Sequence, residues 1–182
     1  MKRIFLLLFG FVAALFVGSC TLPSLPCQQE QPLKLSIQLE QESIESFDQF
    51  HGELTLKNVG KENLLVNGRL AFVPVAWPSQ FIEGVTLITN PSGDIVAPNG
   101  KIDIDFPNVD MFVDLKPGQE IRKLITLRGI GYSSDLFVRG EKYTLVVIYQ
   151  NEMDVQQELD GKIVRSWVGS IKSSPLTFEF TR

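Results

Sequence analysis

The sequence contains few of the residues on which most catalytic and metal centres depend. Its 182 residues include two cysteines and a single histidine, His51. A Ser-His-Asp triad needs such a histidine beside a serine and an acid, and no Gly-x-Ser-x-Gly motif is present to support one. Zinc and copper sites use several His and Cys ligands, and nucleotide sites use a glycine-rich loop that is also missing. We therefore expect a protein that is not an enzyme, has no metal or small-molecule cofactor, and carries His51 on a solvated strand face.

Carboxylates are the remaining route to a metal site, because calcium prefers oxygen ligands. Five aspartates lie close together in the sequence: Asp94, Asp103, Asp105, Asp110 and Asp114. Two of them, Asp103 and Asp105, alternate with Ile102, Ile104 and Phe106, as residues on the wet face of a strand do. No Asp-x-Asp-x-Asp-Gly loop is present, so we favour solvated side chains over the alternative of a calcium site.

The N-terminus has the three parts of a secretory signal. A lysine and an arginine follow the first methionine, residues 4–17 are apolar apart from one glycine, and the small residues Gly18 and Ser19 come next. The apolar run is shorter than the ~20 residues that a helix needs to cross a bilayer. We therefore expect residues 1–19 to form a helical signal segment that is removed from the mature protein.

The residues Val17-Gly18-Ser19-Cys20 make this signal more specific. They resemble the lipobox of bacterial lipoproteins, which implies cleavage before Cys20, diacylglycerol on its thiol and acylation of the new amino group. More than one acyl chain gives stable anchoring in a bacterial cell membrane. Thr21 stands where an aspartate would resemble an inner-membrane retention signal, so the resemblance implies the outer membrane if the organism has two. The alternative is an ordinary secreted protein with a cysteine near its cleavage site.

The segment that follows, residues 20–32, is rich in proline and glutamine and has no regular period. Such a composition is typical of a flexible tether. Its Cys27 is left without a partner if Cys20 is acylated, so we expect an unused thiol, with an intermolecular disulfide as the alternative. The mature chain has fifteen basic and twenty-one acidic residues, a net charge of −6, which argues against nucleic acid and anionic headgroups as partners.

Residues 33–182 alternate apolar and polar side chains with a period of two, which predicts strands. The expected strands are 33–39, 50–57, 64–72, 85–89, 101–106, 121–127, 143–149, 163–171 and 176–180. The run 143–149 is apolar on both faces, which indicates the central strand of the domain. Leu115-Lys-Pro-Gly118 predicts a type II turn, and residues 151–161 read as the longest loop. These features predict an all-β domain, an antiparallel β-sandwich of seven to nine strands.

Three stretches are similar to immunoglobulin-like and fibronectin-type domains of bacterial surface proteins: Leu115–Gly118, Gly140–Tyr143, and Trp167–Gly169 with Ser173–Phe180. The resemblance implies an immunoglobulin-like sandwich over residues 33–182. It also places Tyr143 at a tyrosine corner, where the hydroxyl turns back to the backbone upstream. The cysteine pair of antibody domains is missing, so the resemblance concerns architecture and leaves function open.

Apolar residues between the strands are the candidates for a binding patch, because aromatic residues favour interfaces. They are Trp77, Phe81, Ile82, Met111 and Phe112. The alternative is that both segments fold over the open ends of the core. Trp167 is expected to pack against the sheet that holds strands F and G.

The leading hypothesis is a non-enzymatic binding or structural module, anchored to the envelope by its lipid and bound to an envelope protein. The alternative is a proteinase inhibitor or protease-associated domain, because the sandwich and its Pro-Gly turn resemble the intracellular proteinase inhibitor domain of bacilli. An inhibitor presents an exposed loop, for which residues 74–82 or 151–161 are the candidates.

Overall fold

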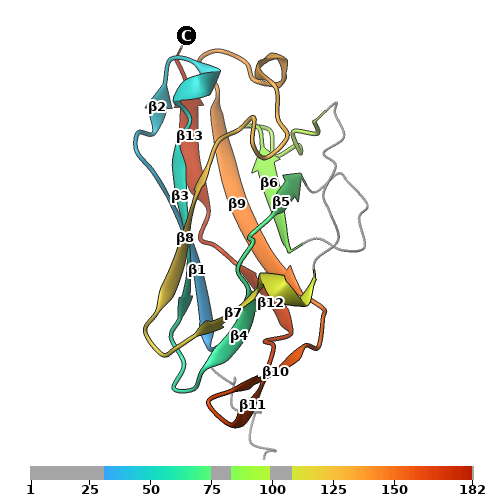
Figure 1. The fold of residues 1–182 in the computed structure, drawn as a ribbon. Helices are drawn as coiled ribbons and strands as arrows, with labels where there is room; N and C mark the ends of the chain where they lie inside the picture. Colours follow the sequence, from blue (N-terminus) through green and yellow to red (C-terminus); the bar gives the residue numbers. More distant parts are fainter. Residues whose placement is uncertain (1–30, 75–82, 99–107, 182) are drawn as a thin grey trace, which may run out of the picture.

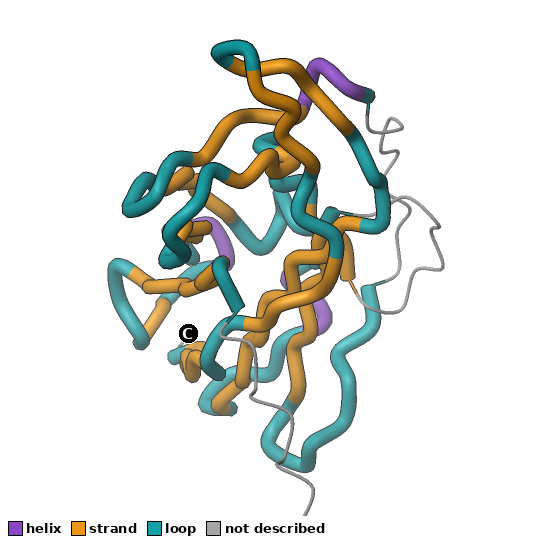
Figure 2. Tube along the Cα trace, turned by 90° about the horizontal axis from the view of Figure 1, so that it is seen from below, coloured by secondary structure: helices purple, strands orange, loops and turns teal. Residues whose placement is uncertain are grey.

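The computed structural model describes residues 31–74, 83–98 and 108–181. The expected signal segment, nearly all of the tether and the expected strand at 101–106 lie outside these ranges. Helix within the described residues is confined to three short 3-10 segments, and strands joined by loops make up most of the remainder (Figure 2). The domain is all-β, as the alternation of apolar and polar residues predicts.

The strands and 3-10 helices are as follows. The strands are β1 (Leu33–Leu39), β2 (Ser43–Ile44), β3 (Gly52–Asn58), β4 (Leu64–Asn67), β5 (Phe72–Pro74), β6 (Gly84–Thr89), β7 (Phe112–Leu115), β8 (Glu120–Ile125), β9 (Lys142–Asn151), β10 (Gln156–Leu159), β11 (Lys162–Arg165), β12 (Gly169–Lys172) and β13 (Leu176–Phe180). The helices are η1 (Phe47–Gln49), η2 (Val109–Met111) and η3 (Ser134–Leu136).

Two larger sheets form the body of the domain, and two two-stranded sheets, β4–β7 and β10–β11, accompany them in the described residues (Figure 1). One of the larger sheets has the order β1-β3-β8, and the other has the order β2-β13-β9-β6-β5, with β12 also paired to β9. An immunoglobulin-like sandwich has strands A, B and E in one sheet and strands C, F and G in the other. Six strands occupy these places in chain order: β1 is A, β3 is B, β6 is C, β8 is E, β9 is F and β13 is G. The strand order is therefore immunoglobulin-like, and most pairs are antiparallel, with β2–β13 and β5–β6 parallel.

The alternation of side chains fixes the register of the first sheet. β1 pairs with β3 from Leu33 opposite Asn58 to Leu39 opposite Gly52. Leu33, Leu35 and Ile37 of β1 are buried and the residues between them are not. A slip of one residue would turn this whole apolar set toward solvent, so burial of one face holds the register.

The strand β9 is the centre of the second sheet, as its apolar sequence predicts. It pairs with β6, β12 and β13. Tyr143 lies at its start, and the Val138 N–H donates a hydrogen bond of 2.7 Å to the Tyr143 hydroxyl oxygen. The predicted tyrosine corner is therefore confirmed. The buried Tyr143 ring stacks on Phe178 at 5.7 Å between ring centres and meets Phe137 edge-on at 4.9 Å.

The turn at Leu115–Gly118 has the predicted form. The Gln119 N–H donates to the Lys116 carbonyl oxygen at 3.0 Å, and Gly118 has a φ of 80°. A type II turn needs a positive φ at its third residue, which glycine adopts without a steric cost. This turn leads the chain from β7 into β8.

The predicted strand at 64–72 is wrong, because the structure divides it into β4 and β5. The Asn67 side-chain oxygen accepts a hydrogen bond from the Arg69 N–H at 3.1 Å, which turns the backbone after Asn67. Leu70 then takes a φ of 49° while its side chain is fully buried. The dipeptide Asn67-Gly68 is a turn signal that the alternation obscured.

The predicted loop at 151–161 is also wrong in part, because β10 and β11 form a hairpin there. Asp160 and Gly161 connect the two strands with φ values of 51° and 73°. A two-residue type I′ turn needs positive φ at both positions, and Asp-Gly is one of its preferred pairs. The hairpin lacks a buried face, so its strands show no apolar alternation.

The predicted run at 163–171 is divided as well. Its first part is β11, its last part is β12, and the buried Ser166 lies between them. The Ser166 hydroxyl donates to the Met153 carbonyl oxygen at 2.6 Å and accepts from the Val155 N–H at 2.8 Å. These divisions, together with the unpredicted strands β2, β7 and β10, bring the number of strands in the described residues to thirteen, above the seven to nine expected.

Candidate functional site

The predicted site residues fall into two groups. Cys20, Trp77, Phe81 and Ile82 lie outside the described residues. Met111 ends η2 and is half-buried. The fifth, Phe112, begins β7 and is 5% exposed, and it forms a small apolar cluster with Leu65 and Val155. The Phe112 ring therefore packs inside the domain and leaves little surface for a partner.

The polar candidates among the described residues are exposed, except Asp114, which is half-buried. His51 is exposed just before β3, with its Nδ1 3.6 Å from Oε2 of Glu40. Asp94 and Asp110 are exposed, and Asp114 accepts a hydrogen bond from Asn63 at 3.2 Å. Asp103 and Asp105 lie outside the described residues, and within the rest the acids, His and Cys form no group of three that could hold a metal ion.

A continuous groove runs along the edge where β1 faces β12 and β13. It consists of three hollows of about 1060, 530 and 320 Å³. Gln31 and Ser170 line both the first and the second hollow, and Ser174 lines both the second and the third. Shared lining residues make the three hollows one feature, which we call the seam groove.

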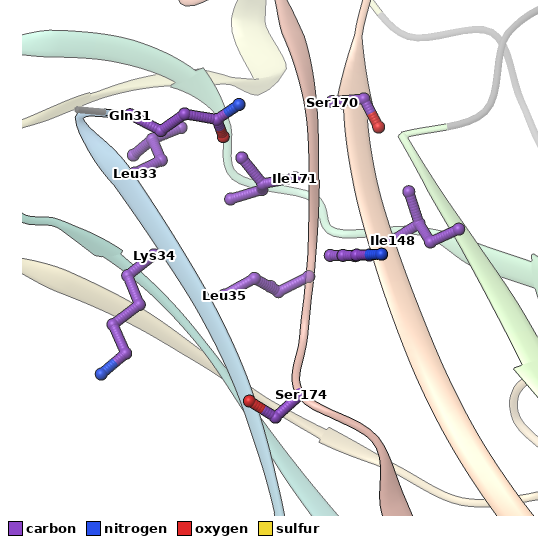
Figure 3. A pocket seen from close by; sticks show the side chains of 9 residues that line it. Gln31, Leu33, Lys34, Leu35, Ile148, Ser170, Ile171 and Ser174 are labelled. Atoms are coloured by element: carbon purple, nitrogen blue, oxygen red, sulfur yellow. The ribbon is translucent and has the colours of Figure 1, made fainter. Parts of the chain in front are cut away.

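The floor of the seam groove belongs to the hydrophobic core. Leu33 and Leu35 of β1 and Ile171 of β12 line the second hollow, and all three are buried core residues. Figure 3 shows these three side chains pointing into the space between β1 and the β12 segment, while Lys34 points away from it. The groove therefore has an apolar floor, and Lys34 lies on the outer face of the first sheet.

The backbone of β1 leaves one row of peptide groups pointing into this groove. In an antiparallel pair, residues that bond to the partner strand alternate with residues whose N–H and C=O groups point away from it. The Val59 N–H donates to the Pro32 carbonyl oxygen at 2.8 Å, and the Glu40 N–H donates to the His51 carbonyl oxygen at 3.2 Å. The even-numbered residues of β1 therefore bond to β3, and the odd-numbered residues from Leu33 to Leu39 point away from it.

The opposite wall is an interrupted strand. The Ser173 N–H donates to the Val147 carbonyl oxygen at 2.8 Å, so the peptide groups of Ser170 and Lys172 point away from β9. The register against β9 shifts by one residue between β12 and β13, which is a β-bulge. Pro175 fits this break because it has no N–H to donate. This break lies in the gap between the strands predicted at 163–171 and 176–180.

The first hollow adds an aromatic ring at the N-terminal end of β1. Trp167 lines it, is half-buried, and stacks on Tyr149 of β9 at 5.7 Å between ring centres. Burial raises the pKa of the Tyr149 hydroxyl. Val59 and Val168 line the same hollow and are each 52% exposed. Trp167 therefore packs on the predicted sheet and also lines this hollow.

A buried polar cluster connects the two sheets. The Glu83 side chain is 4% exposed, and its Oε1 accepts hydrogen bonds from Asn67 at 2.9 Å and from the Arg69 guanidinium. Lys123 of β8 donates to the carbonyl oxygens of Arg69 and Leu70 at 2.9 and 2.8 Å. Burial lowers the pKa of Lys123. The cluster joins β8 to the β4–β5 connection and the start of β6, which is a structural role.

The sequence patterns identified the strands of the groove but not the groove itself. The alternation in residues 33–39 predicts which side chains are buried, whereas an open strand edge depends on how far apart β1 and β12 lie in space. Two features of the sequence could have indicated an open edge here: the proline-rich tether before β1 and the break at Pro175. Both place a proline beside an edge, which is where proline is tolerated in sheets.

Within the described residues, none of the helices has the length and apolar character that crossing a membrane requires. The chain matches no protein-family model, and no curated protein matches it either.

Proposed function

We propose that this protein is a lipid-anchored lipoprotein of a bacterial envelope, and that its β-sandwich domain is a non-enzymatic binding or structural module. The observation that supports a binding role is the seam groove. It combines an apolar floor with a row of peptide groups directed into it, and hydrogen-bonding groups beside apolar surface are what a polypeptide ligand needs. The lipobox-like residues before Cys20 support the anchor.

The proposed anchor and the groove are at the same end of the chain. Eleven residues lead from Cys20 to Gln31, so the tether spans about 40 Å at most. Gln31 itself lines the first two hollows of the seam groove. An anchor at Cys20 therefore holds the groove within reach of proteins at the membrane surface, on the outer membrane where there are two.

The anchor is tested by replacing its cysteine. Cys20→Ser removes the thiol that would carry diacylglycerol, so labelled palmitate should not be incorporated and the protein should leave the membrane fraction. Cys27→Ser is the matched control, because it removes the other cysteine of the same tether, and it should keep both label and location. A Cys20→Ser protein that is still lipid-labelled would show that the assignment is wrong.

The binding role is tested on the full chain in its own membrane. Chemical cross-linking of intact envelopes, followed by purification through this chain, should give a discrete complex with another envelope protein. The anchor variant Cys20→Ser provides the control, because displacement from the membrane should lower the yield of that complex. If the wild-type chain gives no complex above background, the binding role is refuted while the anchor remains open to its own test.

A further inference from the structure

We propose that the seam groove binds an extended peptide segment of an envelope protein, which adds to the free edge of β1 as an extra strand. This inference rests on the binding role proposed above and specifies its ligand. The expected segment has apolar side chains at alternate positions and an acidic side chain between them.

The backbone of β1 supplies the first part of the recognition. Peptide strands that add to a sheet edge gain affinity from main-chain hydrogen bonds. The peptide groups of Leu33, Leu35 and Ile37 point away from β3, and within the described residues β3 is the only strand paired with β1. These groups repeat every second residue, which is the spacing at which an added strand offers its own donors and acceptors.

The side chains of the groove supply the second part. Along an added strand, every second side chain faces the same way as Leu33 and Leu35. Those side chains would lie over the floor, against Ile171 on the opposite wall. Apolar residues at alternate positions match this floor because their own side chains leave water there, while the floor residues are already buried and add little.

The charge around the middle hollow supplies the third part. Lys34 and Lys172 both line it and are exposed, although the mature chain carries a net charge of −6. The side chains of an added strand that face outward lie beside Lys34, where an opposite charge is stabilising across a strand pair. Glu42 lines the third hollow, so the acidic residue belongs in the middle one.

The length of the site is limited at both ends. Pro32 comes before β1, and β2 pairs with β13 at Glu179 and Phe180, which closes the far end. β1 has seven residues between these limits. The segment that fits is therefore about as long as β1, too short to be a domain and long enough to be one strand.

The test uses the purified full chain in detergent and a displayed library of random twelve-residue peptides. The tightest peptide is synthesised, and amide hydrogen exchange is followed residue by residue with and without it. The amides of Leu33, Leu35 and Ile37 should exchange at least about tenfold more slowly in the complex. The amides of Lys34 and Ser36 already bond to β3 and should change little.

Two variants test whether the peptide binds in the groove. The double variant Lys34→Glu/Lys172→Glu should weaken binding about tenfold or more at low salt, because both changes reverse charge beside the acidic residue. Lys162→Glu is the matched control, since Lys162 is also an exposed strand lysine but does not line the groove, and it should bind normally. Ser170→Trp fills the groove from an exposed position and should abolish binding.

Three outcomes would overturn the inference. In the first, the library yields no peptide that binds, and in the second, the bound peptide leaves the odd-numbered β1 amides unprotected from exchange. In the third outcome, these amides are already protected in the free chain by its own tether. The proposed binding role is judged separately in envelopes. If Ser170→Trp cross-links to the envelope partner as well as the wild type does, strand addition is refuted and the binding role stands.

Discussion

The buried carboxylate Glu83 offers the sharpest test of how the two sheets are held together. Its side chain is 4% exposed, and it accepts hydrogen bonds from Asn67 and from Arg69, whose side chain is 20% exposed. The substitution Glu83→Gln keeps the size of the side chain and one acceptor oxygen but removes the negative charge. The Arg69 guanidinium then keeps its charge in a partly buried position without its carboxylate.

The expected cost follows from the burial of the pair. Removing one partner of a buried ion pair costs about 3–5 kcal/mol, because the remaining charge loses the counter-charge of that pair. Arg69 retains some contact with water, so we expect the lower end, about 3 kcal/mol. That is a large share of the ~5–15 kcal/mol that stabilises a domain. For a domain of this size the melting temperature should fall by roughly 6–12 °C.

Urea unfolding at pH 7 measures this loss of stability, and a double-mutant cycle shows how much of it comes from the Arg69–Glu83 pair. The midpoint should fall while the slope of free energy against urea stays the same. The variant Arg69→Met/Glu83→Gln removes both charges, so it should recover at least half of the loss. If Glu83→Gln costs less than about 1 kcal/mol, or if the two single costs add to within ~0.5 kcal/mol, the pair is screened by solvent and the reasoning is refuted.

Three further predictions concern the core. Tyr143→Phe removes the acceptor for the Val138 N–H and should destabilise the domain by about 1–3 kcal/mol in urea unfolding; no change would contradict the tyrosine corner. Gly84→Ala places a Cβ 2.0 Å from two atoms of the Phe72 ring, so thermal melting should show a loss of about 1–3 kcal/mol. Burial raises the pKa of Tyr132 to about 12. Because the unfolded tyrosine ionises near 10, stability should fall between pH 10 and 12 by about 1.4 kcal/mol per pH unit for this group, and Tyr132→Phe should lessen the fall in urea titrations.

The fold could be predicted wherever one sheet face is buried and the other is wet. The alternation in residues 33–39 gave the bounds of β1, and the apolar run at 143–149 gave the central strand. The role of Tyr143 was predicted through the resemblance to immunoglobulin-like domains, and a local turn brings the Val138 N–H to its hydroxyl. Alternation failed at Asn67–Leu70, where one side-chain hydrogen bond turns the chain while Asn67 and Leu70 are both buried.

The site was less predictable, because it depends on distances between strands that are remote in sequence. The buried residues Leu33 and Ile171 lie on different sheets, and their alternation says only that each faces the core. The groove exists because β1 and β12 approach without pairing. That separation comes from the packing of two whole sheets. A one-residue bulge between β12 and β13 also leaves no trace in the pattern of apolar residues. In the sequence, only the proline at its end indicates it.

An unpaired edge strand is a hazard, since any extended chain can add to it, and natural sheets limit such edges with charges, prolines and bulges. The seam groove has all three: Pro32 before β1, Lys34 on its outer face, and the bulge that ends at Pro175. These features restrict the edge to about the length of one strand and disfavour basic segments. The features that limit unspecific pairing with β1 therefore also define the ligand, which is a short strand with an acidic residue and alternate apolar residues. A segment without the acidic residue, or without the apolar alternation, should not bind.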